Sequence, residues 1–181
     1  MHRPLLRRNA AALCVAAGVS LFAASPALAG ADHARADGDL VRYSAAIPVG
    51  AHARVNAVYD ASGSTVVVLH VSGLAPNTAY GAHAHANPCG LTGAAAGPHY
   101  QHVMDPHQPS TSPAYANAQN EIWLDFVTDD EGSGTGTAKV DWQFSPDRRP
   151  GSVIIHAEQT HTGPTDSGTA GARLACLTVD F

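Results

Sequence analysis

Apolar and polar residues alternate with a period of two along most of the chain, and short groups of turn residues interrupt the alternation. The clearest example joins residues 54–59 to residues 65–71 through the turn Asp60-Ala61-Ser62-Gly63. Because no segment shows a convincing helical period, the pattern predicts an all-β fold. Eight strands are expected, at residues 40–47, 54–59, 65–71, 79–85, 121–127, 136–142, 152–156 and 173–179.

Eight short strands without a helix are typical of a β-sandwich or a flattened eight-stranded Greek-key β-barrel. Two long segments lack the period-two alternation, residues 86–120 and residues 157–171. Each follows a predicted strand that ends in histidine. Irregular segments of this length are usually functional or disordered. We therefore expect one β domain over residues 39–181 that carries two long functional loops.

The first 29 residues have the organisation of a secretory signal peptide and are set apart from the fold. Three arginines open the segment, an apolar stretch follows at residues 10–24, and residues 27–29 form an Ala-Leu-Ala cleavage site. The apolar stretch is too short and too rich in small residues to favour a membrane anchor. The sequence thus predicts a secreted or cell-envelope protein that begins at Gly30, with a flexible N-terminal segment at residues 30–38.

Composition narrows the functional classes. The chain has a formal charge of -5, and removal of the predicted signal leaves 7 basic and 15 acidic residues, a net charge of -8. This sign argues against nucleic acid or anionic lipid as the main partner. The same removal leaves Cys89 and Cys176 as the only cysteines, and an even pair in an exported chain predicts a disulfide. Eleven histidines indicate metal chemistry, because histidine is the commonest metal ligand.

Several histidines stand where predicted strands end. His83 and His85 lie two positions apart on one strand, so their side chains share a face, about 7 Å apart along the backbone. His156 ends another apolar strand, and His99 follows the stiff Gly97-Pro98 turn of the first long loop. A solvated polar face would account for His-x-His alone. Four imidazoles from three segments favour a metal site, with Cu(II) preferred and zinc the usual competitor.

Four sequence blocks resemble those of secreted copper/zinc superoxide dismutases. In the family's order they are His83-Ala84-His85, Ala96-Gly97-Pro98-His99, Val153-Ile154-Ile155-His156 and Gly168-Thr169-Ala170-Gly171-Ala172-Arg173-Leu174-Ala175-Cys176. Together they extend over most of residues 40–180. The resemblance implies the family's eight-stranded Greek-key β-barrel and an enzyme that converts superoxide to oxygen and hydrogen peroxide.

The resemblance also implies roles for individual residues. His99 occupies the position that bridges copper and zinc in the family, and it would donate a proton to the peroxide product. Arg173 matches the arginine that guides and holds the superoxide anion, and Cys89 with Cys176 matches the intrasubunit disulfide. Both a monomer and a homodimer stay open. The implied copper ligands are His83, His85, His99 and His156.

The positions at which the family places its zinc ligands depart from the family pattern. Family members place a final His-x-x-Asp before the next strand, where this chain has Asn120 and Trp123, and neither replaces those zinc ligands. An unorthodox zinc site with His99 is the alternative, but its compressed spacing favours solvated loop residues. In lacking these zinc ligands, the chain resembles the copper-only branch of the family. The residues of that alternative zinc site are His102, Asp105 and His107.

Without zinc, another group should orient His99, since a ligating imidazole usually donates its second N–H to a partner. Glu121 and Asp125, at the rim of the next strand, are the candidates. The family's aspartate that links the two metal sites would fall near Thr160, with Asp166 as a candidate replacement.

The leading hypothesis is an exported copper-dependent superoxide dismutase. The alternative is a secreted copper-binding or copper-delivery module on the same fold with little turnover, which the sparsely charged loop at residues 157–171 favours and Arg173 opposes. An interaction domain that had lost the chemistry would lack some of the four copper histidines, and none is missing. A hydrolytic zinc enzyme is disfavoured, because no carboxylate beside the histidines is an evident general base.

Overall fold

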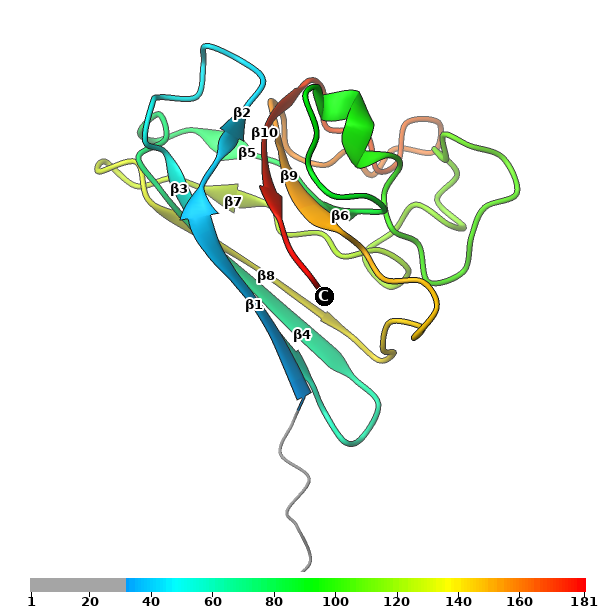
Figure 1. The fold of residues 1–181 in the computed structure, drawn as a ribbon. Helices are drawn as coiled ribbons and strands as arrows, with labels where there is room; N and C mark the ends of the chain where they lie inside the picture. Colours follow the sequence, from blue (N-terminus) through cyan, green and yellow to red (C-terminus); the bar gives the residue numbers. More distant parts are fainter. Residues whose placement is uncertain (1–31) are drawn as a thin grey trace, which may run out of the picture.

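The computed structural model describes residues 32–181, which form two four-stranded sheets and one small sheet (Figure 1). The strand orders are β1-β3-β4-β8, β2-β10-β9-β6 and β5-β7. The predicted signal peptide, residues 1–29, lies outside the described residues. The strands are β1 (Asp32–Asp39), β2 (Val41–Arg42), β3 (His52–Tyr59), β4 (Thr65–Ser72), β5 (Ala79–Tyr80), β6 (Ala82–His85), β7 (Phe126–Val127), β8 (Gly134–Val140), β9 (Ser152–His156) and β10 (Arg173–Thr178).

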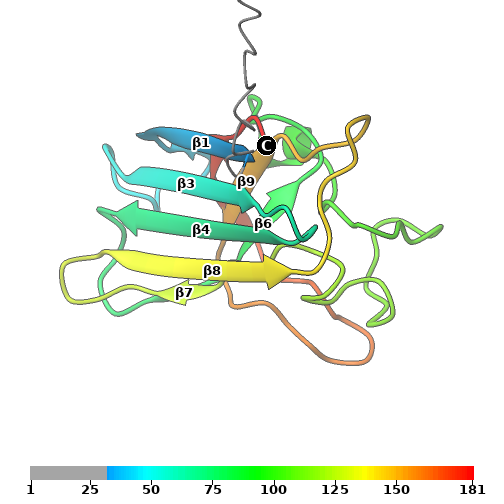
Figure 2. The same ribbon diagram turned by 90° about the horizontal axis from the view of Figure 1, so that it is seen from below.

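The predicted hairpin is confirmed as β3 and β4, which pair over their whole length. In its turn the Asp60 N–H donates to the Ser64 carbonyl at 2.9 Å, and Gly63 adopts a φ of +94° that favours glycine. Residues of β3 and β4 alternate between the core and the outer face. Figure 2 shows this sheet face on, with β1 at one edge and β8 at the other. The period-two pattern therefore predicted both the strands and the buried face.

The flexible N-terminal segment predicted at residues 30–38 is wrong for its described part, because residues 32–38 belong to β1. All eight residues of β1 pair with β3, although only Ala34 among them is buried. Polar contacts support the pairing: Asp37 accepts hydrogen bonds from Arg54 and from His52 Nε2, the latter at 2.7 Å. These two bonds, with Arg54 the stronger, lower the pKa of Asp37 to about 2.

The second sheet contains the strands that carry His83, His85 and His156. Every residue of β6 and β9 is buried, which explains the continuous apolar character of 153–155. In the antiparallel register His83 lies opposite Ile154 and His85 lies opposite Ser152. The two strands therefore lie side by side in one sheet, and His156 at the end of β9 lies next to the start of β6, where its N–H donates to the Gly81 carbonyl at 2.8 Å.

The predicted strand at residues 40–47 is shorter than expected. Only Val41 and Arg42 pair with β10, because the chain then turns, with the Ile47 N–H donating to the Ser44 carbonyl at 3.2 Å.

Two other predicted strands are not continuous. Residues 79–85 split at Gly81, whose N–H donates to the Glu158 carbonyl at 2.7 Å, so β5 pairs with β7 while β6 pairs with β9. Of residues 121–127 only β7 is a regular strand, while Glu121 and Trp123 form isolated bridges. All eight predicted strands thus have a counterpart, and ten result because β1 is added and one strand is divided.

The all-β class is confirmed. The one helical segment described is the short 3-10 helix η1 (Gly93–Ala96). Pairing among residues 32–181 leaves three open sheets, so the hydrogen-bonded barrel expected as one alternative does not close. The space between the two large sheets is filled by a common apolar core that draws on both. In this part of the chain no helix has the length and apolar character needed to cross a membrane.

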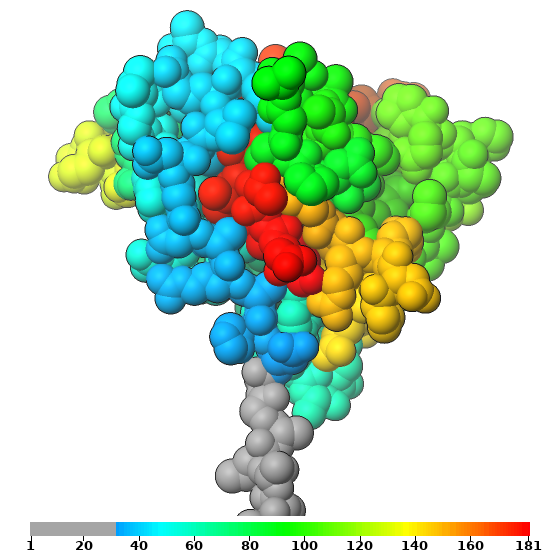
Figure 3. Space-filling view, in the orientation of Figure 1, coloured from blue at the N-terminus to red at the C-terminus, as the bar shows by residue number. Residues whose placement is uncertain are grey.

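A disulfide fastens the first long loop to the second sheet. It joins Cys89, in the loop that contains η1, to Cys176 in β10, with the Cα atoms 5.9 Å apart. Cys176 packs with Ala96 of η1 and Ile154 of β9 in a small second core. In Figure 3 the C-terminal segment (red) surfaces between the N-terminal strands (blue) and this loop (green). The loop that carries His99 is therefore held against the sheet that carries His83, His85 and His156.

Candidate metal centre

Four histidines converge where β6, β9 and the first long loop meet. β6 supplies two, the end of β9 supplies one, and the loop residue His99 joins β6 through a backbone bridge with His85. One ring nitrogen from each lies within 4.8 Å of the others; three of the residues are buried and His99 is partly exposed. The structure thus brings together all four copper ligands that the sequence resemblance implies: His83, His85, His99 and His156.

Each of these imidazoles uses one nitrogen for an outward hydrogen bond. That leaves the Nδ1 atom of His83 and the Nε2 atoms of the other three for the centre of the cluster, where the Nε2 atoms of His85 and His156 are 3.4 Å apart. The outward bonds are His83 Nε2 to Thr160 Oγ1 (2.6 Å), His85 Nδ1 to the Gly97 carbonyl (3.0 Å), His99 Nδ1 to Glu121 Oε2 (2.8 Å) and His156 Nδ1 to the Gly171 carbonyl (3.4 Å).

The inward nitrogens fit a metal ion. His83 Nδ1 is buried and has no hydrogen-bond partner within residues 32–181. An unpartnered polar atom in the interior is costly unless something binds it. Four imidazole nitrogens around one point are a donor set that suits copper or zinc rather than calcium or magnesium.

The environment keeps the ligands in the form that coordinates. Burial, reinforced by the nearby His99, lowers the pKa of His83 and His85 well below the ordinary value of 6.5. The same two causes lower the pKa of His156 to about 3. These three imidazoles are therefore neutral at pH 7, as metal binding requires.

Glu121 holds His99 from the side opposite the centre. The carboxylate is buried, and its Oε2 accepts the His99 Nδ1–H at 2.8 Å and the Trp123 Nε1–H at 2.7 Å. Its Oε1 accepts from Gln101 Nε2 at 2.8 Å. Of the two candidates for orienting His99, Glu121 makes the contact, whereas Asp125 accepts from Thr160.

The sequence pattern did not single out Gln101. A glutamine two residues after a histidine has no distinctive signal, and its role depends on the fold of the loop. Its side chain is buried, and its Oε1 accepts the Asp105 N–H at 3.0 Å while its amide donates to Glu121. Gln101 therefore links the carboxylate behind His99 to the loop that borders the site.

The residues of the alternative zinc site do not join His99. The His102 ring stacks on Trp142, with ring centroids 4.7 Å apart and planes 9° from parallel. Asp105 is buried and its Oδ1 accepts the His107 N–H at 2.8 Å, so it organises the loop backbone. Among the described residues, the four-histidine cluster is the only group of three or more histidine, cysteine or acidic side chains close enough to share an ion.

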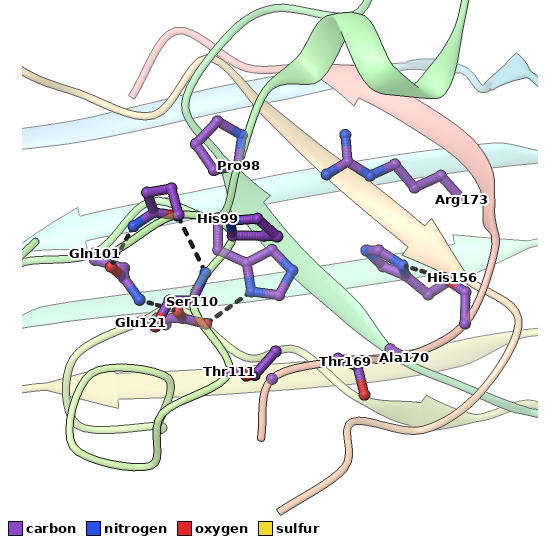
Figure 4. Close-up of a pocket in the computed structure, with 14 residues that line it drawn as sticks. Pro98, His99, Gln101, Ser110, Thr111, Glu121, His156, Thr169, Ala170 and Arg173 are labelled. Atoms are coloured by element: carbon purple, nitrogen blue, oxygen red, sulfur yellow. Dashed lines mark hydrogen bonds and ion pairs between the residues drawn. The ribbon is translucent and has the colours of Figure 1, made fainter. Parts of the chain in front are cut away.

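A cleft of about 330 Å³ gives access to the cluster; His99, His156, Arg173 and residues 168–171 line it (Figure 4). In Figure 4 Arg173 lies across the cleft from Glu121. The Arg173 Nη1–H donates to the Gly93 carbonyl at 2.7 Å. A Cβ atom at position 93 would lie 2.8 Å from the Arg173 Cβ, so glycine permits this approach. Burial lowers the pKa of Arg173, but a guanidinium keeps its charge in proteins.

Comparison with known proteins agrees with this site. The sequence model of the copper/zinc superoxide dismutase family (SODC) matches residues 49–179, and the chain belongs to this family. No curated protein matches the sequence. A solved structure, the crystal structure of the clock protein EA4, is similar over 80% of this chain and 92% of that chain, with a TM-score of 0.55 and 19% identity. At this identity the likeness shows the fold alone.

Proposed function

We propose that the protein is an exported copper-dependent superoxide dismutase that works without a zinc ion, as in the copper-only branch of its family. The observation that carries the proposal is the convergence of four imidazoles, one ring nitrogen of each lying within 4.8 Å of the others. Membership of the superoxide dismutase family supports the reaction and the metal. The signal-like sequence of residues 1–29 supports export.

The four histidines would hold copper through the Nδ1 atom of His83 and the Nε2 atoms of the other three. Bound there, copper would supply the one-electron exchange by which one superoxide is oxidised to oxygen and a second, with two protons, is reduced to hydrogen peroxide. The protein supplies the binding, orientation and electrostatics. The β6–β9 pairing and the disulfide fix the positions of these side chains.

Arg173 gives the cleft its attraction for a small anion. It is the one permanent cation among the residues that line the cleft. The low-dielectric walls of a cleft concentrate the field of such a charge, so it attracts superoxide even in a chain of net negative charge. Its guanidinium is held by the Gly93 carbonyl and keeps its orientation as the anion binds.

His99 is placed to handle a proton. Its Nδ1–H is fixed on Glu121, while its partly exposed ring borders the cleft. Proton donation from Nε2 to peroxide would be general acid catalysis. A buried carboxylate on Nδ1 fixes the orientation of the ring, so Glu121 takes over the orienting task that the zinc ion performs in the family pattern.

A copper-delivery module is the second candidate, and the second long loop favours it. The acidic residues of that loop, Glu158 and Asp166, both lie against His161, with contacts of 3.2 Å and 3.0 Å. Residues 157–171 contain no lysine or arginine, so the loop adds no permanent cation to guide superoxide to the cleft. A carrier needs the four histidines but has no need of Arg173.

The Arg173→Ala substitution separates the two candidates. For a dismutase, the second-order rate constant for superoxide decay should fall about 10-fold or more at low salt, because field focusing of this kind is worth 10- to 1,000-fold. Copper content should stay at one per chain. Decay is followed by stopped flow, with the exposed Arg35→Ala in β1 as the control for loss of one charge. Decay no faster than that of free copper, in both the copper-loaded wild type and Arg173→Ala, would support the carrier.

A further inference from the structure

The hydroxyl group of Thr160 lies between a copper-ligand imidazole and a carboxylate. Its Oγ1 is 2.6 Å from His83 Nε2 and 2.6 Å from Asp125 Oδ1. The direct separation of His83 Nε2 and Asp125 Oδ1 is 4.0 Å, which is too long for a hydrogen bond. The carboxylate therefore reaches this imidazole only through the threonine.

The direction of these hydrogen bonds is set by chemistry. An ionised carboxylate only accepts, so the single hydroxyl proton of Thr160 goes to Asp125. The hydroxyl oxygen then accepts the proton of His83 Nε2. In a neutral imidazole that leaves the lone pair on Nδ1, the buried atom that has no hydrogen-bond partner among residues 32–181 and that belongs to the four-histidine cluster.

The backbone brings Thr160 to this position. Gly81, just before β6, donates its N–H to the Glu158 carbonyl at 2.7 Å, and a Cβ atom at position 81 would lie 2.5 Å from that oxygen. Glycine thus lets the second long loop approach β6. The Thr160 N–H then donates to Asp125 Oδ2 at 2.7 Å, so both carboxylate oxygens of Asp125 hold the same loop residue. Asp166, in contrast, faces His161.

We propose that Asp125 and Thr160 form a positioning relay that fixes the His83 ring as an Nδ1 ligand and makes the second long loop part of the copper site. The inference rests on the proposed copper site for its consequence, but the relay exists in the metal-free protein. Thr160 acts through His83, so it is a positioning residue. The relay occupies the place where the family pattern has an aspartate.

The first test measures copper binding. Thr160→Val keeps the shape of the side chain and removes the hydroxyl, so copper affinity, measured by competition with a chelator, should fall 10- to 100-fold. The electron paramagnetic resonance spectrum of bound Cu(II) should change, because one ligand is no longer held. Thr160→Ser should restore both to within about threefold of the wild type. Thr165→Val, at an exposed position of the same loop, is the matched control.

The second test needs no metal. Long-range proton–nitrogen correlation spectra of the metal-free protein, labelled at histidine, should show His83 protonated at Nε2 in the wild type and in Thr160→Ser. Thr160→Val should show a mixed or reversed tautomer, and Asp125→Asn an intermediate state. Thermal unfolding confirms that each variant is folded.

The outcomes distinguish the relay from the proposed function. An unchanged tautomer and unchanged copper affinity in a folded Thr160→Val would overturn the relay. A tautomer that shifts in a protein that binds no copper would support the relay and contradict the proposed function.

Discussion

Replacing Cys89 and Cys176 together by serine is expected to lower the free energy of unfolding by about 4 to 5 kcal/mol. The disulfide closes a segment of 87 residues, and a cross-link over that length removes entropy of about this size from the unfolded chain. The double substitution avoids a free thiol. Urea unfolding of the metal-free protein measures the change, provided that the transition stays cooperative.

Reduction of the wild type should reproduce the loss, which serves as the control. Breaking the disulfide should also disturb the candidate metal site, because the disulfide holds η1, whose Gly93 carbonyl accepts from Arg173. A loss below about 1 kcal/mol would mean that the unfolded chain keeps this segment compact without the cross-link.

The Glu121→Gln substitution is expected to lower copper affinity or the dismutase rate by about 10- to 100-fold, as losses behind a metal-bound histidine typically do. Glu121 accepts three hydrogen bonds, from His99, Trp123 and Gln101. A glutamine has one accepting oxygen and an amide group that only donates, so at least one of the three donors faces another donor. Chelator competition and stopped-flow decay measure the two effects.

The matched control is Glu131→Gln, the same change at an exposed turn position. It should leave copper affinity and superoxide decay at wild-type values. If Glu121→Gln behaved like this control, the carboxylate would not replace zinc as the group that orients His99, and that part of the proposed mechanism would be wrong.

The sequence was sufficient to predict those features of the structure that depend on neighbouring residues in the chain. The β3–β4 hairpin is predicted by alternation and a turn motif, and its partners are adjacent in the chain. His83 and His85 share a face because strand geometry alone requires it. His99 was placed with the other histidines as a fourth imidazole on a stiff turn, but its bridging and proton-donating role came from the resemblance to a family, since spacing alone does not show that a loop residue returns to β6.

Long-range pairing explains what the sequence did not predict. β1 has little apolar character, and it forms a strand because β3 offers an unpaired edge. The division of residues 79–85 follows from a contact between Gly81 and Glu158, which are far apart in the chain.

The structure was also needed to decide which of two carboxylates orients His99. Glu121 and Asp125 have the same chemistry and lie four positions apart, and the structure gives one to His99 and the other, through Thr160, to His83. No local pattern distinguishes them, because each contact depends on which loop folds back over the sheet.

The central claim is tested most directly by following superoxide decay as copper is added to the protein from Gly30 to Phe181, with its disulfide formed and zinc removed. The account predicts that the decay rate rises in proportion to copper up to one ion per chain, gains nothing from added zinc, and is lost in His83→Ala. Decay no faster than that of free copper, or decay that appears only after zinc is added, would contradict it.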